Sequence, residues 1–308
     1  MVRALADERS ITPMRMYVVT DLEGVAGVYQ WENRDDTSLE NHERRCRQRR
    51  WSAAEVNAMG EGFFAGGATE AWVYDGHGAG YTIDIGLVDP RIRILHGRGA
   101  PSYCTGLDEN CAAIGSLGTH AMAGTQWANL AHTMGTSIRR YSLNGIDVGE
   151  TGYQAFLAGH FGVPFVFCAG DAYACREMEE LVPGCITVAV KEGIGLMAAR
   201  TVPPTRSCEM IREAAEEAMK HIDEIEPLKL EPPIVFRCEY YEPTLDPEKT
   251  SPNKHIIDSH TFEIEAENMV DFMNKMYGFD PSYVPIWETY TPVSMPREGR
   301  SCPWEGQS

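Results

Sequence analysis

The sequence is short of positive charge. It contains 27 lysine and arginine residues against 45 aspartate and glutamate residues, which gives a formal net charge of −18 at pH 7. Nucleic acids and anionic membrane surfaces both require a positive protein surface, so this balance argues against either as a partner. The simplest interpretation of the negative charge is solubility, and it selects no substrate.

Long apolar runs are also missing. No stretch approaches the roughly 20 consecutive apolar residues of a membrane-spanning helix. The first residues, MVRALADERSITP, lack the apolar centre of a secretory signal. We therefore expect a cytoplasmic protein with a loose N-terminal extension over residues 1–15.

Paired cysteine motifs are absent as well. The nine cysteines are an odd number, lie scattered along the chain and form no CxxC pair. This pattern is typical of reduced thiols in the cytoplasm, several of them buried in a core, and not of a disulfide framework.

Several common active-site motifs do not occur. The glycines at 76, 78 and 80 lack the GxGxxG spacing of dinucleotide-binding proteins, and the chain has no GxxxxGK[ST], HExxH or GxSxG sequence. These absences argue against a Rossmann cofactor site, a P-loop, an HExxH zinc peptidase and a serine hydrolase with a nucleophile elbow.

Short apolar segments separated by helical patterns make up the first two thirds of the chain. Strands are predicted at residues 17–19, 71–74, 92–95, 112–119, 138–143, 165–168 and 187–190, and helices at 51–65, 151–160 and up to residue 181. Strands alternating with helices at short spacing are typical of a parallel sheet. The fold class is therefore α/β, with a mainly parallel sheet core and helices on both faces, over residues 16–202.

The pattern changes after Pro203 and Pro204. An amphipathic helix is predicted over 207–222, followed by strands at 234–240 and 261–264 and a last helix at 268–277. We interpret residues 203–279 as a smaller C-terminal α+β lobe. Residues 280–308 contain several prolines and no periodicity, which predicts a tail.

The first predicted strand ends in two acidic residues. Asp21 and Glu23 are separated only by Leu22, and residues two apart in an extended chain point to the same side. Two carboxylates held this close repel each other unless a cation or a shared proton lies between them. A metal site is one interpretation of this turn, and a solvated turn is the other.

Further side chains of metal-ligand type follow later segments. His77 comes after the second strand, His120 after a later strand, and Glu150 at the start of a helix. In a parallel sheet these loops meet at one edge, where ligands bind. Each residue alone has a structural explanation, as a turn residue, a buried histidine or a helix N-terminal acid. Their common placement favours a metal site.

The candidate ligand set consists of three carboxylates and two imidazoles. This mixture suits Zn²⁺, Mn²⁺ or Co²⁺ and not Ca²⁺ or an iron–sulfur cluster. A single catalytic zinc typically takes about three protein ligands, so five ligands predict two metal ions that share a carboxylate.

The segments VTDLEGVAG, VYDGHG, LGTHAMAG, NLAHTM and NGIDVGETG occur in this order, followed by CAGDAYACREMEELVPGCITVAVKEG. Together they resemble the zinc D-aminopeptidase family of bacterial dipeptide-transport operons, over about Met16 to Tyr277. The resemblance implies metal ligands at Asp21, Glu23, His77, His120 and Glu150, a bridging role for Asp21, and a catalytic histidine at His132. It also implies short peptide substrates with an N-terminal D-residue, and a decamer of two stacked five-membered rings that enclose the active sites.

We therefore predict a di-metal aminopeptidase with two Zn²⁺ per chain. Two alternatives stay open. One is an amidase or esterase of other specificity on the same metal centre, and the other is a non-catalytic, metal-stabilised peptide-binding protein that serves transport. For His132 we favour proton transfer to the departing amine, or stabilisation of the oxyanion, over a nucleophilic role, because a metal-activated water makes a covalent step unnecessary. A buried histidine with a structural role is the alternative.

Overall fold

The computed structural model describes residues 14–278 apart from 79, 98 and 249. The predicted extension up to residue 13 and the predicted tail over 280–308 lie outside this range. Arg15, assigned to the extension, is instead the first residue of a strand. Among the described helices, none combines the length and the apolar character needed to cross a membrane.

A seven-stranded sheet forms the centre of the molecule. Its strands run in the order β3 (Ile92–Leu95), β2 (Glu70–Asp75), β1 (Arg15–Thr20), β4 (Cys111–Thr119), β7 (Phe165–Asp171), β8 (Ile186–Gly195) and β9 (Ala198–Thr201). All neighbouring strands are parallel except β9, which pairs antiparallel with β8. The mainly parallel sheet confirms the predicted fold class.

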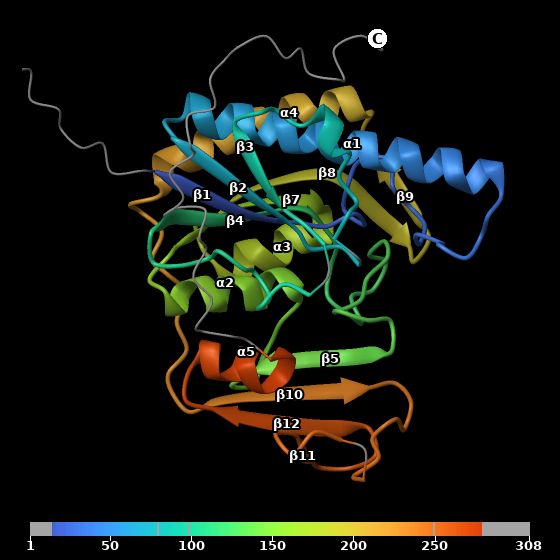
Figure 1. The fold of residues 1–308 in the computed structure, drawn as a ribbon, viewed down its shortest axis with the longest axis vertical. Coiled ribbons are helices and arrows are strands. Elements are labelled where there is room, and N and C mark those ends of the chain that lie inside the picture. Colours follow the sequence, from blue (N-terminus) through green and yellow to red (C-terminus); the bar gives the residue numbers. More distant parts are fainter. Residues whose placement is uncertain (1–13, 79, 98, 249, 279–308) are drawn as a thin grey trace, which may run out of the picture.

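Helices cover both faces of this sheet (Figure 1). The helices are α1 (Leu39–Ala65) and α4 (Pro204–Ala218) on one face and α2 (Glu150–His160) and α3 (Ala172–Leu181) on the other, with short 3₁₀ turns η1 (Ile85–Leu87) and η2 (Met219–His221). Helix α1 begins earlier than predicted because Ser38 caps it, its hydroxyl accepting a hydrogen bond from the amide of Asn41 at 3.2 Å.

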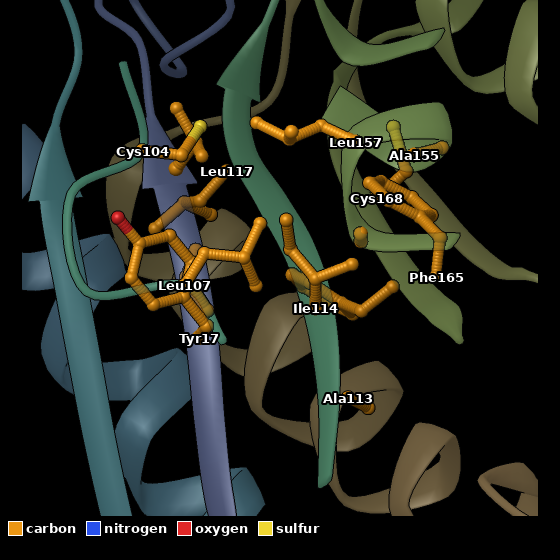
Figure 2. Close-up of a cluster of buried hydrophobic side chains, with 14 of the residues drawn as sticks. Tyr17, Cys104, Leu107, Ala113, Ile114, Leu117, Ala155, Leu157, Phe165 and Cys168 are labelled. Atoms are coloured by element: carbon orange, nitrogen blue, oxygen red, sulfur yellow. The ribbon is translucent and has the colours of Figure 1, made fainter. Parts of the chain in front are cut away.

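Strand β1 lies inside the sheet, between β2 and β4, and is buried along its whole length. Burial on both faces explains why its sequence is a continuous apolar run without alternation. Figure 2 shows Tyr17 from β1 beside Ile114 and Leu117 from β4, with Phe165 from β7 on the far side. The core thus fixes the end of β1, where the two acidic residues begin.

A second, antiparallel sheet lies beside the first. Its strands run in the order β11 (His255–Ile256), β12 (Thr261–Ala266), β10 (Ile234–Tyr240), β5 (Ile138–Leu143) and β6 (Ile146–Asp147), and α5 (Met269–Tyr277) packs against it. The predicted turn at Asn144 and Gly145 joins β5 to β6, and both residues have positive φ angles, 49° and 81°. Such angles are typical of a two-residue hairpin turn.

The membership of the two sheets does not follow the predicted division at residue 202. Strands β5 and β6 come from the first predicted domain but pair with β10 and with each other. Helix α4 comes from the second predicted lobe but packs against α1 and β8. A strand's sequence shows which face is apolar and not which strand it pairs with, so this exchange was not visible in the sequence.

Candidate metal centre

The turn after β1 is held tightly against β4. The amide of Asp21 donates to the backbone oxygen of Leu117 at 2.8 Å. A Cβ atom on Gly24 would lie 2.0 Å from the backbone oxygen of Thr119, so only glycine fits this approach. The two backbones therefore fix the direction in which Asp21 and Glu23 leave the strand.

His77 follows β2 and points its Nδ1 atom at both of these carboxylates. The distances are 3.0 Å to Oδ1 of Asp21 and 2.8 Å to Oε2 of Glu23. Its other ring nitrogen, Nε2, lies 3.4 Å from Oε2 of Glu32. The ring therefore lies between the predicted ligands and a third carboxylate.

His120 follows β4 and is almost completely buried. Its Nδ1 atom lies 3.0 Å from the backbone oxygen of Ala121. A carbonyl oxygen only accepts, so Nδ1 is the donor and Nε2 is the atom that faces the site. That Nε2 atom lies 3.0 Å from Oδ2 of Asp21 and 3.4 Å from Oε1 of Glu150.

His132 stacks on His120 with ring centroids 3.9 Å apart and an angle of 15° between the rings. Its Nδ1 atom donates to the backbone oxygen of Leu130 at 2.9 Å, which leaves Nε2 facing Glu150 at 3.8 Å. The same Glu150 oxygen accepts a hydrogen bond from the amide of Met134 at 2.6 Å. The loop that carries His132 is thus tied to the start of α2.

The structure therefore brings together the side chains of all six residues that the sequence analysis selected. Glu150 arrives by a different route from the one expected, because it follows the β5–β6 hairpin of the second sheet and not a strand of the parallel sheet. The carboxylate of Glu150 therefore reaches the common edge from the start of α2, which follows a hairpin of the second sheet.

The cluster is chemically suited to a metal cation. Oε2 of Glu23 and Nε2 of His120 are buried, and neither atom makes a well-aligned hydrogen bond among the described residues, although His77 lies 2.8 Å from the first and Asp21 3.0 Å from the second. A lone pair that faces carboxylates is unfavourable unless a proton or a cation lies between them. Two groups have their ligand atoms within 4.8 Å of one another, namely Asp21 with Glu23 and His120, and His120 with His132 and Glu150. The second group includes His132, which the sequence analysis treats as catalytic.

The pKa shifts of the clustered side chains also favour a bound cation. Burial alone lowers the pKa of His77 and His120, yet the facing carboxylates outweigh it and raise the pKa of both rings well above their usual range. Burial raises the pKa of Asp21, but the close approach and positive charge of His120 and His77 outweigh it and hold that pKa well below its usual range. Without a cation the site therefore attracts protons, and a divalent metal would compete for the same positions.

Sequence reasoning missed Glu32, which lies next to the site. Its carboxylate forms ion pairs with Nε of Arg45 at 2.9 Å and with Nη2 of Arg34 at 2.7 Å, in addition to its contact with His77. Burial raises the pKa of Glu32, but hydrogen bonds from His77 and Arg34 outweigh it and hold that pKa far below the usual value. The only sign of its role in the sequence was its position soon after the acidic turn.

Lys191 and Trp31 were missed as well. Lys191 lies buried in β8 and donates to the backbone oxygens of Glu23 and Val28 and, at 2.7 Å, to Oδ1 of Asn129. A lysine inside an apolar strand was the sign that the sequence offered. Trp31 contacts the ring of His132 edge-on at a centroid distance of 5.1 Å, and nothing in the sequence indicated this contact.

Comparison with known proteins gives matches over most of the chain. Residues 14–277 match the family described as D-aminopeptidase. A D-aminopeptidase of Bacillus subtilis (strain 168) is 31% identical over 217 residues, which cover 70% of this chain and 77% of that protein. A solved structure, the Zn-dependent D-aminopeptidase DppA from Bacillus subtilis, a self-compartmentalizing protease, superposes with a TM-score of 0.79 at 28% identity, over 85% of this chain and 95% of the other.

The family match, the curated relative and the solved structure agree with each other and with the resemblance found in the sequence. The matched region includes the acidic turn after β1, the histidine loops after β2 and β4, and the start of α2. The chain therefore belongs to the D-aminopeptidase family and is a hydrolase of that family.

Proposed function

We propose that the protein is a zinc-dependent aminopeptidase that removes D-amino acids from the N-termini of short peptides, with two Zn²⁺ ions per chain. The observation that carries the proposal is the cluster of three carboxylates and two imidazoles, two of whose buried atoms make no well-aligned hydrogen bond among the described residues. The zinc dependence of the DppA structure supports the choice of metal.

Asp21, Glu23, His77, His120 and Glu150 would hold the two ions. Asp21 is suited to contact both, because its two oxygens face different imidazoles, each at 3.0 Å. Zinc bound there would polarise the scissile carbonyl and lower the pKa of a water molecule toward neutrality. Family membership favours this function over an amidase, an esterase or a non-catalytic binding protein.

His132 would move the proton that the departing amine needs. Its Nδ1–H group is fixed by the backbone oxygen of Leu130 at 2.9 Å, so the ring cannot easily turn and Nε2 stays on the side of the site. Stacking on His120 restrains the ring further. A neutral imidazole with one free nitrogen is able to accept and return a proton near neutral pH.

Turnover and metal content together test the proposal. Zinc-reconstituted protein is assayed against matched D- and L-aminoacyl anilides, dipeptides and simple esters, and metal is counted per chain. We expect cleavage of the D-aminoacyl peptides and two zinc ions in the wild type. Asp21→Ala is expected to lose both ions, whereas the exposed control Asp35→Ala keeps them. Cleavage of esters alone, or one stable ion in the wild type, would contradict the proposal.

We also propose that the protein works in the cytoplasm as a homo-oligomer, a decamer of two stacked five-membered rings. The description of DppA as a self-compartmentalizing protease supports an enclosing assembly. Light scattering at micromolar concentration is expected to give about ten times the chain mass. A protein-sized substrate such as casein is expected to resist digestion while dipeptides are cut, and a monomeric mass would refute the assembly.

A further inference from the structure

We propose that a pocket beside His132 binds the side chain of the peptide residue on the C-terminal side of the scissile bond, and that it selects apolar side chains there. The inference rests on the proposed function and adds a specificity site to it. The pocket is a cavity of about 510 Å³ whose walls include Trp31, Trp127, Leu196 and Tyr241, and His132 is one of its lining residues.

His132 borders both the pocket and the metal cluster. One face of the His132 ring stacks on His120. Trp31 and His132 make an edge-to-face contact, with ring centroids 5.1 Å apart and an angle of 82° between the rings. A peptide whose scissile bond lies at the cluster therefore has a neighbouring side chain within reach of this cavity.

The walls of the pocket are apolar and yet accessible. Trp127 is 61% exposed, Leu196 55% and Tyr241 50%, whereas aromatic and aliphatic side chains of the core are almost fully covered. No lysine or arginine is among the described residues that line the cavity. Covering such a surface with an apolar side chain is favourable, and the surface offers no lysine or arginine to pair with a carboxylate.

The walls are held rigidly in place. The backbone oxygen of Leu196 accepts hydrogen bonds from the amide of Leu130 at 2.8 Å and from Nδ2 of Asn129 at 3.1 Å. Lys191 holds Oδ1 of the same Asn129 at 2.7 Å. The β8–β9 turn is thus tied to the loop that carries His132, which is what a preformed binding pocket requires.

Backbone strain is concentrated in that loop. Trp127, Leu130 and Met134 have φ angles of 68°, 53° and 61°, in the left-handed region that bulky residues rarely adopt. Strain of this kind persists where surrounding contacts enforce it, and it clusters at binding and catalytic sites. Here it presents the Trp127 side chain to the pocket.

The role of His132 decides which peptide residue occupies the pocket. In the proposed function His132 delivers a proton to the departing amine. That nitrogen belongs to the residue after the scissile bond, so the side chain on this residue lies on the His132 side of the substrate. The N-terminal residue would then lie nearer the carboxylates.

Two truncations test the assignment in the zinc-loaded full chain. Because the backbone oxygen of Leu196 makes its hydrogen bonds, Leu196→Ala removes only pocket surface, and Trp127→Ala removes a second wall. Leu87→Ala, at a 53% exposed leucine in η1, is the matched control. The measured quantity is the ratio of kcat/KM for D-alanyl-phenylalanine to that for D-alanyl-glycine, together with the oligomer mass.

We expect the ratio to be well above one in the wild type and to fall roughly tenfold in each pocket variant, but not in the control. Free phenylalanine is also expected to perturb tryptophan fluorescence in the zinc-free protein, and several-fold more weakly in Leu196→Ala. An unchanged ratio would refute the pocket. If the oligomer mass changes as well, this face belongs to a contact with a second copy of the chain. A wild type that cleaves neither peptide would refute the proposed function instead.

Discussion

At the scale of single residues, the orientation of each histidine ring decides what it is able to do. His120 and His132 both donate Nδ1–H to backbone oxygens, whereas His77 turns Nδ1 toward the carboxylates. In each ring Nε2 is the nitrogen left for a further partner. This difference separates His77, which has a carboxylate on each side, from His132, whose second nitrogen faces Glu150 and no other carboxylate of the described residues.

His132→Ala tests the catalytic assignment. We expect the variant to keep its fold and both metal ions but to lose roughly 10²–10⁴ in kcat, the usual contribution of general acid–base catalysis. Metal analysis and circular dichroism accompany the kinetics. A variant that loses a metal ion would make His132 a ligand, in agreement with its closeness to His120 and Glu150, and normal turnover would remove it from the mechanism.

Glu32 is expected to set the protonation of His77. A carboxylate near Nε2 holds the proton there, which leaves the Nδ1 lone pair for a cation. Glu32→Gln is therefore expected to weaken zinc binding by roughly 10–100-fold, measured by competition with a chelator. Glu43→Gln, at an exposed position in α1, is the control. Equal zinc affinity in both variants would show that Glu32 is only a partner for Arg34 and Arg45.

At the scale of secondary-structure elements, the contact between α1 and α4 contains a buried acid. Glu55 of α1 is 1% exposed and accepts hydrogen bonds from the amide of Ala26 at 3.1 Å and from the hydroxyl of Ser207 in α4 at 2.8 Å. Burial raises its pKa to about 7, against the effect of these donors. We therefore expect the contact between the two helices to depend on pH.

The sign of that dependence follows from proton uptake. Between the ordinary pKa of glutamate and pH 7, the folded state holds the proton on Glu55 and the unfolded state does not, so unfolding becomes easier as the pH rises. Between pH 5 and pH 8 we expect the free energy of unfolding of the wild type to fall by up to about 3 kcal/mol more than that of Glu55→Gln. Urea unfolding of zinc-free wild type and variant, at one protein concentration, measures it. Parallel pH profiles for the two proteins would exclude the assignment.

At the scale of the whole molecule, the candidate metal centre joins segments that are far apart in the chain. Its carboxylates and imidazoles come from the ends of β1, β2 and β4 and from the start of α2, which follows a strand pair of the second sheet. Metal binding would therefore stabilise the arrangement of both sheets, because a ligand that binds only the folded state raises its stability.

Removal of zinc is expected to lower the thermal stability of the wild type. At zinc concentrations about a thousandfold above the dissociation constant, we expect the unfolding temperature to rise by roughly 5–10 °C relative to the chelated protein. In Asp21→Ala the two temperatures should nearly coincide. Scanning calorimetry at one protein concentration checks both, and a full zinc shift in the variant would mean that the metal binds elsewhere.

The sequence by itself determined the features that depend on local pattern. The apolar run before Asp21, the glycines after Glu23 and the alternation of strands with helices are local, and each recurs in the structure as a strand end, a turn or a layer. Because parallel strands end at a common edge, these patterns were enough to select residues that lie together around His120. The order of the motifs was enough to indicate the family.

Only the tertiary structure decided which segments meet across long distances in the chain. The pairing of β5 with β10, the packing of α4 on α1 and the approach of Glu32 to His77 all join residues more than forty positions apart. The apolar face of a strand or helix fits many partners, and its sequence does not name one. The pocket beside His132 arises in the same way, because Trp31, Trp127 and Leu196 become neighbours only after the chain has folded.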